Sequence, residues 1–254
     1  MLRRGVLKGL AAAHPWGRGC SAALPAWLPR SSPLARRPQP ACLTQKRPIV
    51  QLPKAPPETA AMCKAVAELV CAWAGKHVVE HTLCPFAKPA LKSGNVRIVA
   101  RCDLKAETAV AELIMKEAHL LAATTEKEIA TTFIALPAFS PTDFEAYHTF
   151  TEHLGNIMED NYFISDVLLA AFHPDFMFDG IEEDDEVVNF EKRAPLPVIN
   201  LLRGDVIDNS IAAGFKVEAL QERNERTLKS KGIEDVFSSF VSLKPMRGSV
   251  RDWE

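Results

Sequence analysis

The longest helical pattern of apolar residues covers about residues 59–83, and the turn that ends it organises the rest of the chain. Its apolar positions are spaced by threes and fours, which indicates one core-facing stripe: Met62, Val66, Leu69, Val70 and Trp73. Cys84 precedes Pro85, and a proline suits the first position of a helix, so Cys84 is a candidate N-cap. A thiol beside helix N–H groups tends toward the thiolate. The alternative is that Cys84 is a small apolar side chain in a tight turn.

Beyond that turn, the pattern predicts three strands that alternate with two helices. The strands are expected at residues 96–102, 130–136 and 166–172, and the helices between them at 106–123 and 142–160. Crossovers of that length favour parallel strands. Further helices are expected from about residue 198 and at 217–230. The prediction is an α/β fold: a short parallel sheet of about three strands (β-α-β-α-β) flanked by helices, with a leading helix and C-terminal helices.

Charge divides the chain into two parts. Residues 1–57 hold ten basic and no acidic side chains, which leaves 20 basic and 32 acidic residues, a net charge of about −12, for the remainder. An acid-free, Arg-rich segment resembles an organellar transit peptide, so residues 1–48 are predicted to target the mitochondrion, with a plastid as second choice and a basic tail as the alternative. Residues 49–58 are predicted to be a linker, 59–232 a single domain and 233–254 an extension.

Composition excludes several partners. An acidic body argues against nucleic acid, and no run of 18 uncharged apolar residues predicts a transmembrane span. Six cysteines without a C-x-x-C pair fit free thiols in a reducing compartment, such as the matrix or the matrix face of the inner membrane. Phosphate-binding, nucleophile-elbow and dinucleotide motifs are all missing from the sequence, which therefore names no cofactor.

Ligands of open parallel sheets bind beyond the carboxyl ends of the strands. His173 follows the third predicted strand and is the best-placed titratable group at that edge. Imidazole is the usual general base near neutral pH, so His173 is a candidate catalytic base. The alternative is a histidine that packs and hydrogen-bonds at a strand end.

Five short runs resemble the signature blocks of the domain-of-unknown-function family 1415. They are LCPFA at 83–87, AFHPDFMF at 171–178, Asn189 with RAPLP at 193–197, LLR at 201–203 and ERN at 222–224. Their order and spacing match over about residues 66–232. The resemblance implies a shared fold and a shared pocket, with no established activity to carry over. It points to these residues: Cys84, Phe86, His173, Asn189, Arg193, Arg203, Glu222, Arg223 and Asn224.

The arginines in this set suit a carboxylate or a phosphate, because a guanidinium group can bond two oxygens at once. The leading hypothesis is therefore a site for a small anionic metabolite at the strand edge, with Arg193, Arg203, Arg223 and Asn189 as ligand-binding residues. If the site is catalytic, His173 is the base and Cys84 the nucleophile. Alternatively, the arginines hold the C-terminal helices in place through Glu222 and Asn189.

The chain departs from the family pattern at two positions. Where the family tends to have a His-Leu-Leu-Arg-Glu run, this chain has Asn200 and Gly204 at the two ends of that run. Losing both ionisable groups suggests a non-catalytic accessory subunit of a mitochondrial complex, for example an inner-membrane energy-transducing complex such as ATP synthase. Residues 239–254 supply apolar anchors for such a partner, namely Phe240, Val241, Met246 and Trp253.

A further alternative is a zinc-dependent hydrolase. His77, Glu80 and His81 match the H-x-x-E-H arrangement of inverted zinc peptidases, with Glu152 or Glu159 as a distal ligand. The pentapeptide lies outside the blocks of the family resemblance, and the domain is small for such a peptidase. No metal site is predicted on this basis.

Overall fold

One four-stranded sheet is the centre of the fold. The computed structural model describes residues 57–140, 142–161, 164, 166–181, 183–216 and 218–243. The predicted targeting segment at 1–48, most of the linker at 49–58, and residues 244–254 of the extension lie outside the described residues. Within them the elements follow in this order: α3 (Pro57–Trp73), η1 (Ala74–Val79), α4 (Ala87–Ser93), β1 (Val96–Ala100), α5 (Glu107–Ala123), β2 (Thr131–Ala135), α6 (Phe144–Asp160), β3 (Val167–Phe172), η2 (Glu183–Glu191), β4 (Val198–Arg203), α7 (Gly204–Ala212), α8 (Glu218–Lys231) and α9 (Ile233–Val241).

The predicted α/β class is confirmed, but the sheet has one strand more than expected. The strand order is β1-β2-β4-β3, and β4 replaces the helix that was predicted from about residue 198. β1 and β2 are parallel, whereas β4 is antiparallel to both of its neighbours, with Ala170 opposite Asn200 and Ile134 opposite Ile199. The three predicted strands therefore share one direction, and the expectation of a purely parallel sheet was wrong. A short, mostly apolar run such as residues 198–202 fits a buried strand and a helix equally well, and β-branched Val198 and Ile199 fit the strand.

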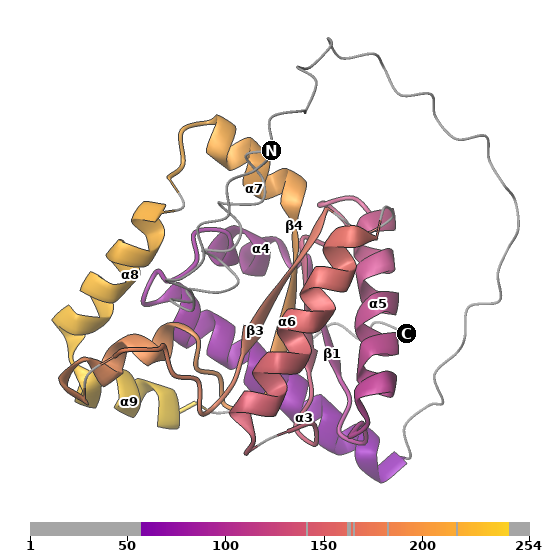
Figure 1. Ribbon diagram of the computed structural model, residues 1–254, viewed down its shortest axis with the longest axis horizontal. Coiled ribbons are helices and arrows are strands. Elements are labelled where there is room, and N and C mark those ends of the chain that lie inside the picture. The colour runs from indigo at the N-terminus through magenta and orange to yellow at the C-terminus, as the bar shows by residue number, and fades with distance from the viewer. Residues whose placement is uncertain are drawn as a thin grey trace, which may run out of the picture. The chain divides into compact units, whose positions relative to one another are not determined.

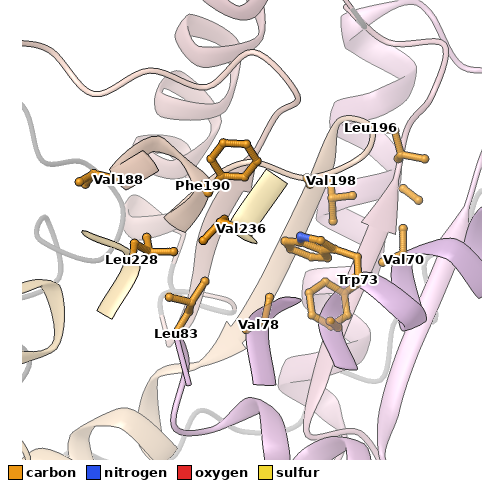
Figure 2. Packing of buried hydrophobic residues seen from close by; sticks show 14 of the residues in the cluster. Val70, Trp73, Val78, Leu83, Val188, Phe190, Leu196, Val198, Leu228 and Val236 are labelled. Carbon is orange, nitrogen blue, oxygen red and sulfur yellow. The ribbon is translucent and has the colours of Figure 1, made fainter. Parts of the chain in front are cut away.

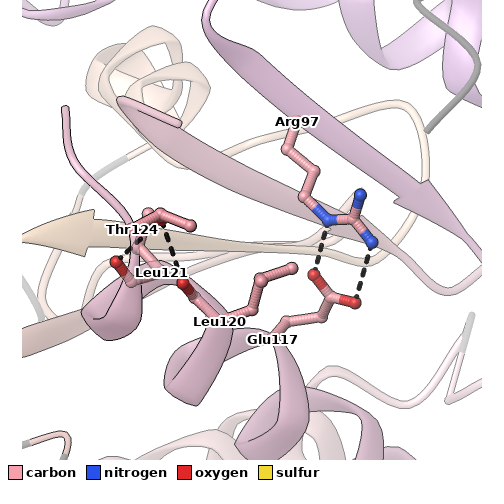
Figure 3. Close-up of polar contacts among 5 residues, drawn as sticks. All are labelled: Arg97, Glu117, Leu120, Leu121 and Thr124. Carbon is pink, nitrogen blue, oxygen red and sulfur yellow. Dashed lines mark hydrogen bonds and ion pairs between the residues drawn. The ribbon is translucent and has the colours of Figure 1, made fainter. Parts of the chain in front are cut away.

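Helices cover both faces of the sheet. In Figure 1, α5 and α6 lie in front of the strands, and α3 crosses behind them. An ion pair joins α5 to β1, because Glu117 accepts hydrogen bonds from Nε and Nη2 of Arg97 at 2.7 and 3.1 Å (Figure 3). Thr124, just after α5, turns its hydroxyl back to the carbonyls of Leu120 and Leu121 (Figure 3).

Trp73 is the centre of the core between α3 and the sheet. It is fully buried, and its ring makes T-shaped contacts with the rings of Phe133 and Phe172 at centroid distances of 6.1 and 5.0 Å. Its Nε1 donates to the carbonyl of Arg193 at 3.1 Å. Figure 2 shows this cluster, which continues through Leu228 of α8 and Val236 of α9. The same apolar core therefore anchors the C-terminal helices.

The first predicted helix is not one regular α-helix. After Trp73 the chain forms the π-helix η1, and the turn at Thr82 has a φ of 55°. Wide π turns are rare and occur frequently at functional sites. Ala74 and Val78 of η1 face a cavity, so the change in helix type shapes the wall of the site described next.

Candidate functional site

A cavity of about 240 Å³ lies between one face of the sheet and the segment from α3 to α4. Side chains on a strand alternate between faces, so residues two apart share a face. Except for Arg203 at the last position of β4, the strand residues that line the cavity belong to the α3 face: Val96, Thr131, Phe133, Ala170, Phe172, Asn200 and Leu202. Trp73, Ala74, Val78, Leu83 and Phe86 close the opposite side. The cavity is thus largely apolar, with few polar groups.

Cys84 reaches this cavity from the turn after η1. It is not the N-cap predicted from the sequence, because α4 begins at Ala87 and Phe86 holds the N-cap position. Burial raises the pKa of the Cys84 thiol, although the backbone N–H groups of Phe86 and Ala87 and the charges of Lys192 and Arg223 act the other way. The structure therefore favours the neutral thiol over the thiolate, since removing a charge from water costs more than these contacts return.

Glu191 and Lys192 line the cavity beside Cys84, at the end of η2. Burial lowers the pKa of Lys192, with the charges of Glu191 and Cys84 opposing the shift. Burial also raises the pKa of Glu191, with Lys192 and Asn224 opposing it. The Nζ of Lys192 lies 5.4 Å from the centre of the Phe172 ring. Both residues are half-buried.

Two polar residues of α8 hold the Cys84 turn against η2. Asn224 donates to the carbonyl of Leu83 at 2.8 Å and to Oε1 of Glu191 at 3.1 Å. Arg223 donates to the carbonyl of Thr82 and to Oδ1 of Asn224. We call Cys84, Glu191, Lys192, Arg223 and Asn224 the Cys84 cluster. It gathers three residues that the family resemblance singled out.

The far end of the cavity is marked by Arg203. In register, Arg203 lies opposite Val167 and Val198 opposite Phe172, so five residues, or about 17 Å, separate the two ends of β4. The guanidinium of Arg203 donates through Nε to the carbonyl of Ile129 at 2.8 Å and through Nη2 to Thr124 Oγ1 at 3.1 Å. These bonds fasten the end of β4 to the segment between α5 and β2.

His173 does not line the cavity. It is fully buried, its Nε2 donates to the carbonyl of Ser140 at 2.8 Å, and its Nδ1 accepts from the N–H of Asp175 at 3.1 Å. These partners select the neutral tautomer with the proton on Nε2. The rings of Phe144 and Tyr147 lie at centroid distances of 5.6 and 5.1 Å. In this arrangement His173 ties the end of β3 to two loops.

Arg193 and Asn189 also lie outside the cavity lining. Arg193 donates to the carbonyl of Phe176 and to Glu186, and it stacks on Phe190 with 4.9 Å between Cζ and the ring centre. Asn189 accepts a hydrogen bond from the N–H of Phe178 at 2.9 Å. Both residues thereby fix η2 to the segment after β3, whereas Glu222 is exposed on α8 and Phe86 lines the cavity. The structure brings Cys84 and Arg203 to one cavity and leaves His173, Arg193 and Asn189 outside it.

The H-x-x-E-H residues form a buried pair of imidazoles. The rings of His77 and His81 are 5.1 Å apart, His77 Nε2 contacts the carbonyl of Phe190 at 2.7 Å, and Glu80 is exposed. The Nδ1 atoms of both histidines are buried without a hydrogen-bond partner among the described residues. Burial lowers the pKa of His77 to about 4. In the described part of the chain, no group of three or more His, Cys, Asp or Glu side chains could hold a metal ion.

Sequence reasoning missed Lys192 and Glu191. Both lie between Asn189 and Arg193, two positions that the resemblance did identify, so their place in a signature block was the available signal. Their role depends on burial, which charged residue types give no reason to expect. None of the described helices is long and apolar enough to cross a membrane.

Comparison with known proteins gives one match. The model of the family described as "Protein of unknown function (DUF1415)" matches residues 65–237, which include every element from η1 to α8 and the Cys84 cluster. No curated protein and no solved structure matches the chain. The resemblance predicted over about residues 66–232 is confirmed over that whole range, and the chain belongs to the DUF1415 family.

Proposed function

We propose that the protein binds a small, largely apolar molecule with one anionic group, and that the anion lies at Lys192. The observation that carries the proposal is the Lys192 side chain in the lining of a largely apolar cavity, with its Nζ over the Phe172 ring. Apolar cavities with a few well-placed polar groups are typical of small-molecule sites. A volume of 240 Å³ equals that of about eight water molecules, so the ligand is small.

Electrostatics support an anion at this end. Burial lowers the pKa of Lys192, so the charged amine lacks the solvation that it would have in water. A ligand carboxylate in contact with Nζ stabilises the charged amine and raises that pKa. Binding then takes up a proton whenever the amine starts neutral, so affinity for the anion increases as the pH falls.

Thermal unfolding with matched ligands tests this proposal. Hexanoate is expected to raise the melting temperature more than hexan-1-ol, which has the same chain without a charge. Lys192→Met keeps the apolar stem and removes the amine, so this variant should lose the preference for hexanoate. Lys88→Met, at an exposed position of α4, is the matched control. An unchanged preference in Lys192→Met, or no stabilisation by either ligand, would contradict the proposal.

Membership of a larger assembly is a second proposal, supported by α9. Three apolar side chains four residues apart on this helix are exposed: Ile233 at 41%, Phe237 at 52% and Val241 at 61%. An apolar stripe of this kind is typical of a helix that packs on another protein. Size fractionation of a native organelle extract tests the idea, and migration at the mass of a single chain argues against it. We also propose that residues 1–48 direct the chain to the mitochondrion, which a fluorescent fusion of this segment tests.

A further inference from the structure

We infer that the ligand of this cavity is an oxo acid, and that the side-chain amide of Asn200 binds its oxo oxygen. The inference rests on the function proposed above, because it requires the same small anion in the same cavity. It narrows the class of ligand from a carboxylate with an apolar body to one that also carries a hydrogen-bond acceptor on that body.

Asn200 is a buried amide with a donor that the protein does not use. Only 8% of the residue is exposed, and it lines the cavity. The hydroxyl group of Thr131 donates to Oδ1 at 2.6 Å, so the amide is oriented with Oδ1 toward Thr131 and Nδ2 away from it. The described residues supply no hydrogen-bond partner for Nδ2. Because a buried donor without a partner is costly, Nδ2 favours a ligand that supplies an acceptor.

The neighbours of Asn200 on the sheet leave this amide without a polar partner. Phe133 of β2 and Ala170 of β3 lie opposite Asn200 in register, and both also line the cavity. The side chain of Ala170 is a single methyl group, and neither side chain contains oxygen or nitrogen. A saturated chain that fills this part of the cavity therefore covers Nδ2 and leaves it unpaired, whereas an oxo oxygen accepts its hydrogen bond.

The register of β3 and β4 indicates where the oxo group lies on the ligand. Asn200 is opposite Ala170, and Phe172 follows two residues later on β3, which is about 7 Å along the strand. The Nζ of Lys192, where the carboxylate is proposed to bind, lies 5.4 Å from the centre of the Phe172 ring. This separation favours an oxo group several carbons away from the carboxylate over one on the adjacent carbon.

Calorimetric titration of the full chain with three six-carbon acids tests the inference. Hexanoate, 2-oxohexanoate and 5-oxohexanoate have the same charge and the same chain length, and the two oxo acids differ only in the position of the oxygen. The affinity for 5-oxohexanoate should exceed that for either of the others roughly threefold to tenfold, as one net hydrogen bond predicts. This comparison uses the unmodified protein, so it does not depend on the folding of any variant.

Two variants of β4 test the role of the amide itself. Asn200→Leu replaces the amide by an apolar group of similar size, and the Thr131 hydroxyl keeps the carbonyl of Leu201, 2.8 Å away, as its acceptor. This variant should lose the preference for 5-oxohexanoate over hexanoate. Leu202→Met is the matched control, because Leu202 lines the same cavity two residues away on the same strand. It should keep the preference.

The outcomes separate this inference from the proposal on which it rests. Tighter binding of 5-oxohexanoate that is lost in Asn200→Leu supports the oxo acid. Equal affinities for the three acids in the unmodified protein, with weaker binding of hexanoate in Lys192→Met, overturn the oxo acid and leave the anion site standing. A preference that persists in Asn200→Leu overturns the role of Asn200. Absence of binding by all three acids overturns both proposals.

Discussion

Thr131 donates its hydroxyl hydrogen to Oδ1 of Asn200 across 2.6 Å, on neighbouring strands that both line the cavity. The same hydroxyl lies 2.8 Å from the carbonyl of Leu201. The structure thus places a neutral amide, held by a threonine, in the floor of the cavity.

Replacing Thr131 by valine is expected to destabilise the protein by about 1–3 kcal/mol, because the buried Asn200 amide loses its partner. The adjacent Thr132 supplies a matched control. Its hydroxyl is buried on the other face and has no hydrogen-bond partner among the described residues. Thr132→Val should therefore be neutral or stabilising. Urea unfolding measures both, and equal losses in the two variants would refute this account of the Thr131 hydroxyl.

Gly204 is required by a close approach of two backbones. Its N–H donates to the carbonyl of Asp166 at 2.7 Å, and a Cβ at position 204 would lie 2.7 Å from that same oxygen. Gly204→Ala should cost about 1–3 kcal/mol because β4 and α7 must shift. Gly155→Ala, where a Cβ meets nothing within 4 Å in α6, should stabilise by about 0.5–1 kcal/mol. Thermal unfolding measures the stability of both variants, and a Gly204→Ala variant as stable as the unmodified protein would contradict the close approach.

Stability is expected to fall as the solution becomes acidic. Burial lowers the pKa of His77 from 6.5 to about 4, so between these values the unfolded chain binds a proton that the folded chain does not. The free energy of unfolding should therefore drop by about 3 kcal/mol from pH 6.5 to pH 4 through this residue. His81, whose pKa burial also lowers, adds to the same trend.

The variant His77→Gln, which keeps a donor for Phe190, should flatten this pH dependence in urea titrations. The exposed His119 on α5 gives the control, because His119→Gln leaves the buried imidazoles in place. A slope that is the same in His77→Gln and in the unmodified protein would show that His77 titrates normally.

Cys63 and Cys102 are expected to form a disulfide under oxidising conditions. Their sulfurs are 3.0 Å apart, Cys63 is partly exposed, and burial raises the pKa of Cys102 to about 12. The sulfur of Cys63 should attack oxidised glutathione first, which releases one reduced glutathione, and the sulfur of Cys102 should then displace the second glutathione from the mixed disulfide. Intact mass should show the loss of two hydrogens, and Cys102→Ser should instead retain a glutathione adduct on Cys63. A stable adduct in the unmodified protein would contradict this pairing.

The sequence by itself determined the helices and strands that can be recognised from the spacing of apolar residues within a short segment. The β-α-β-α-β order was predicted with bounds close to those observed, for example 106–123 against Glu107–Ala123 for α5. The spacing is informative because the residues on the buried face recur with the period of the helix or strand that carries them. The family followed from short blocks of residues in a fixed order.

Only the tertiary structure decided how β4 pairs and what the polar residues do. Strand pairing joins residues far apart in sequence, and a short, mostly apolar run does not reveal its partner, so the pattern at β4 predicted a helix. Burial likewise depends on neighbours from several elements. It gives His173 two partners within the protein, leaves Cys84 a neutral thiol and places Lys192 beside Glu191 in an apolar wall. The residue type determines which reactions a side chain could take part in. The packing of distant segments determines the protonation state and the accessibility of that side chain.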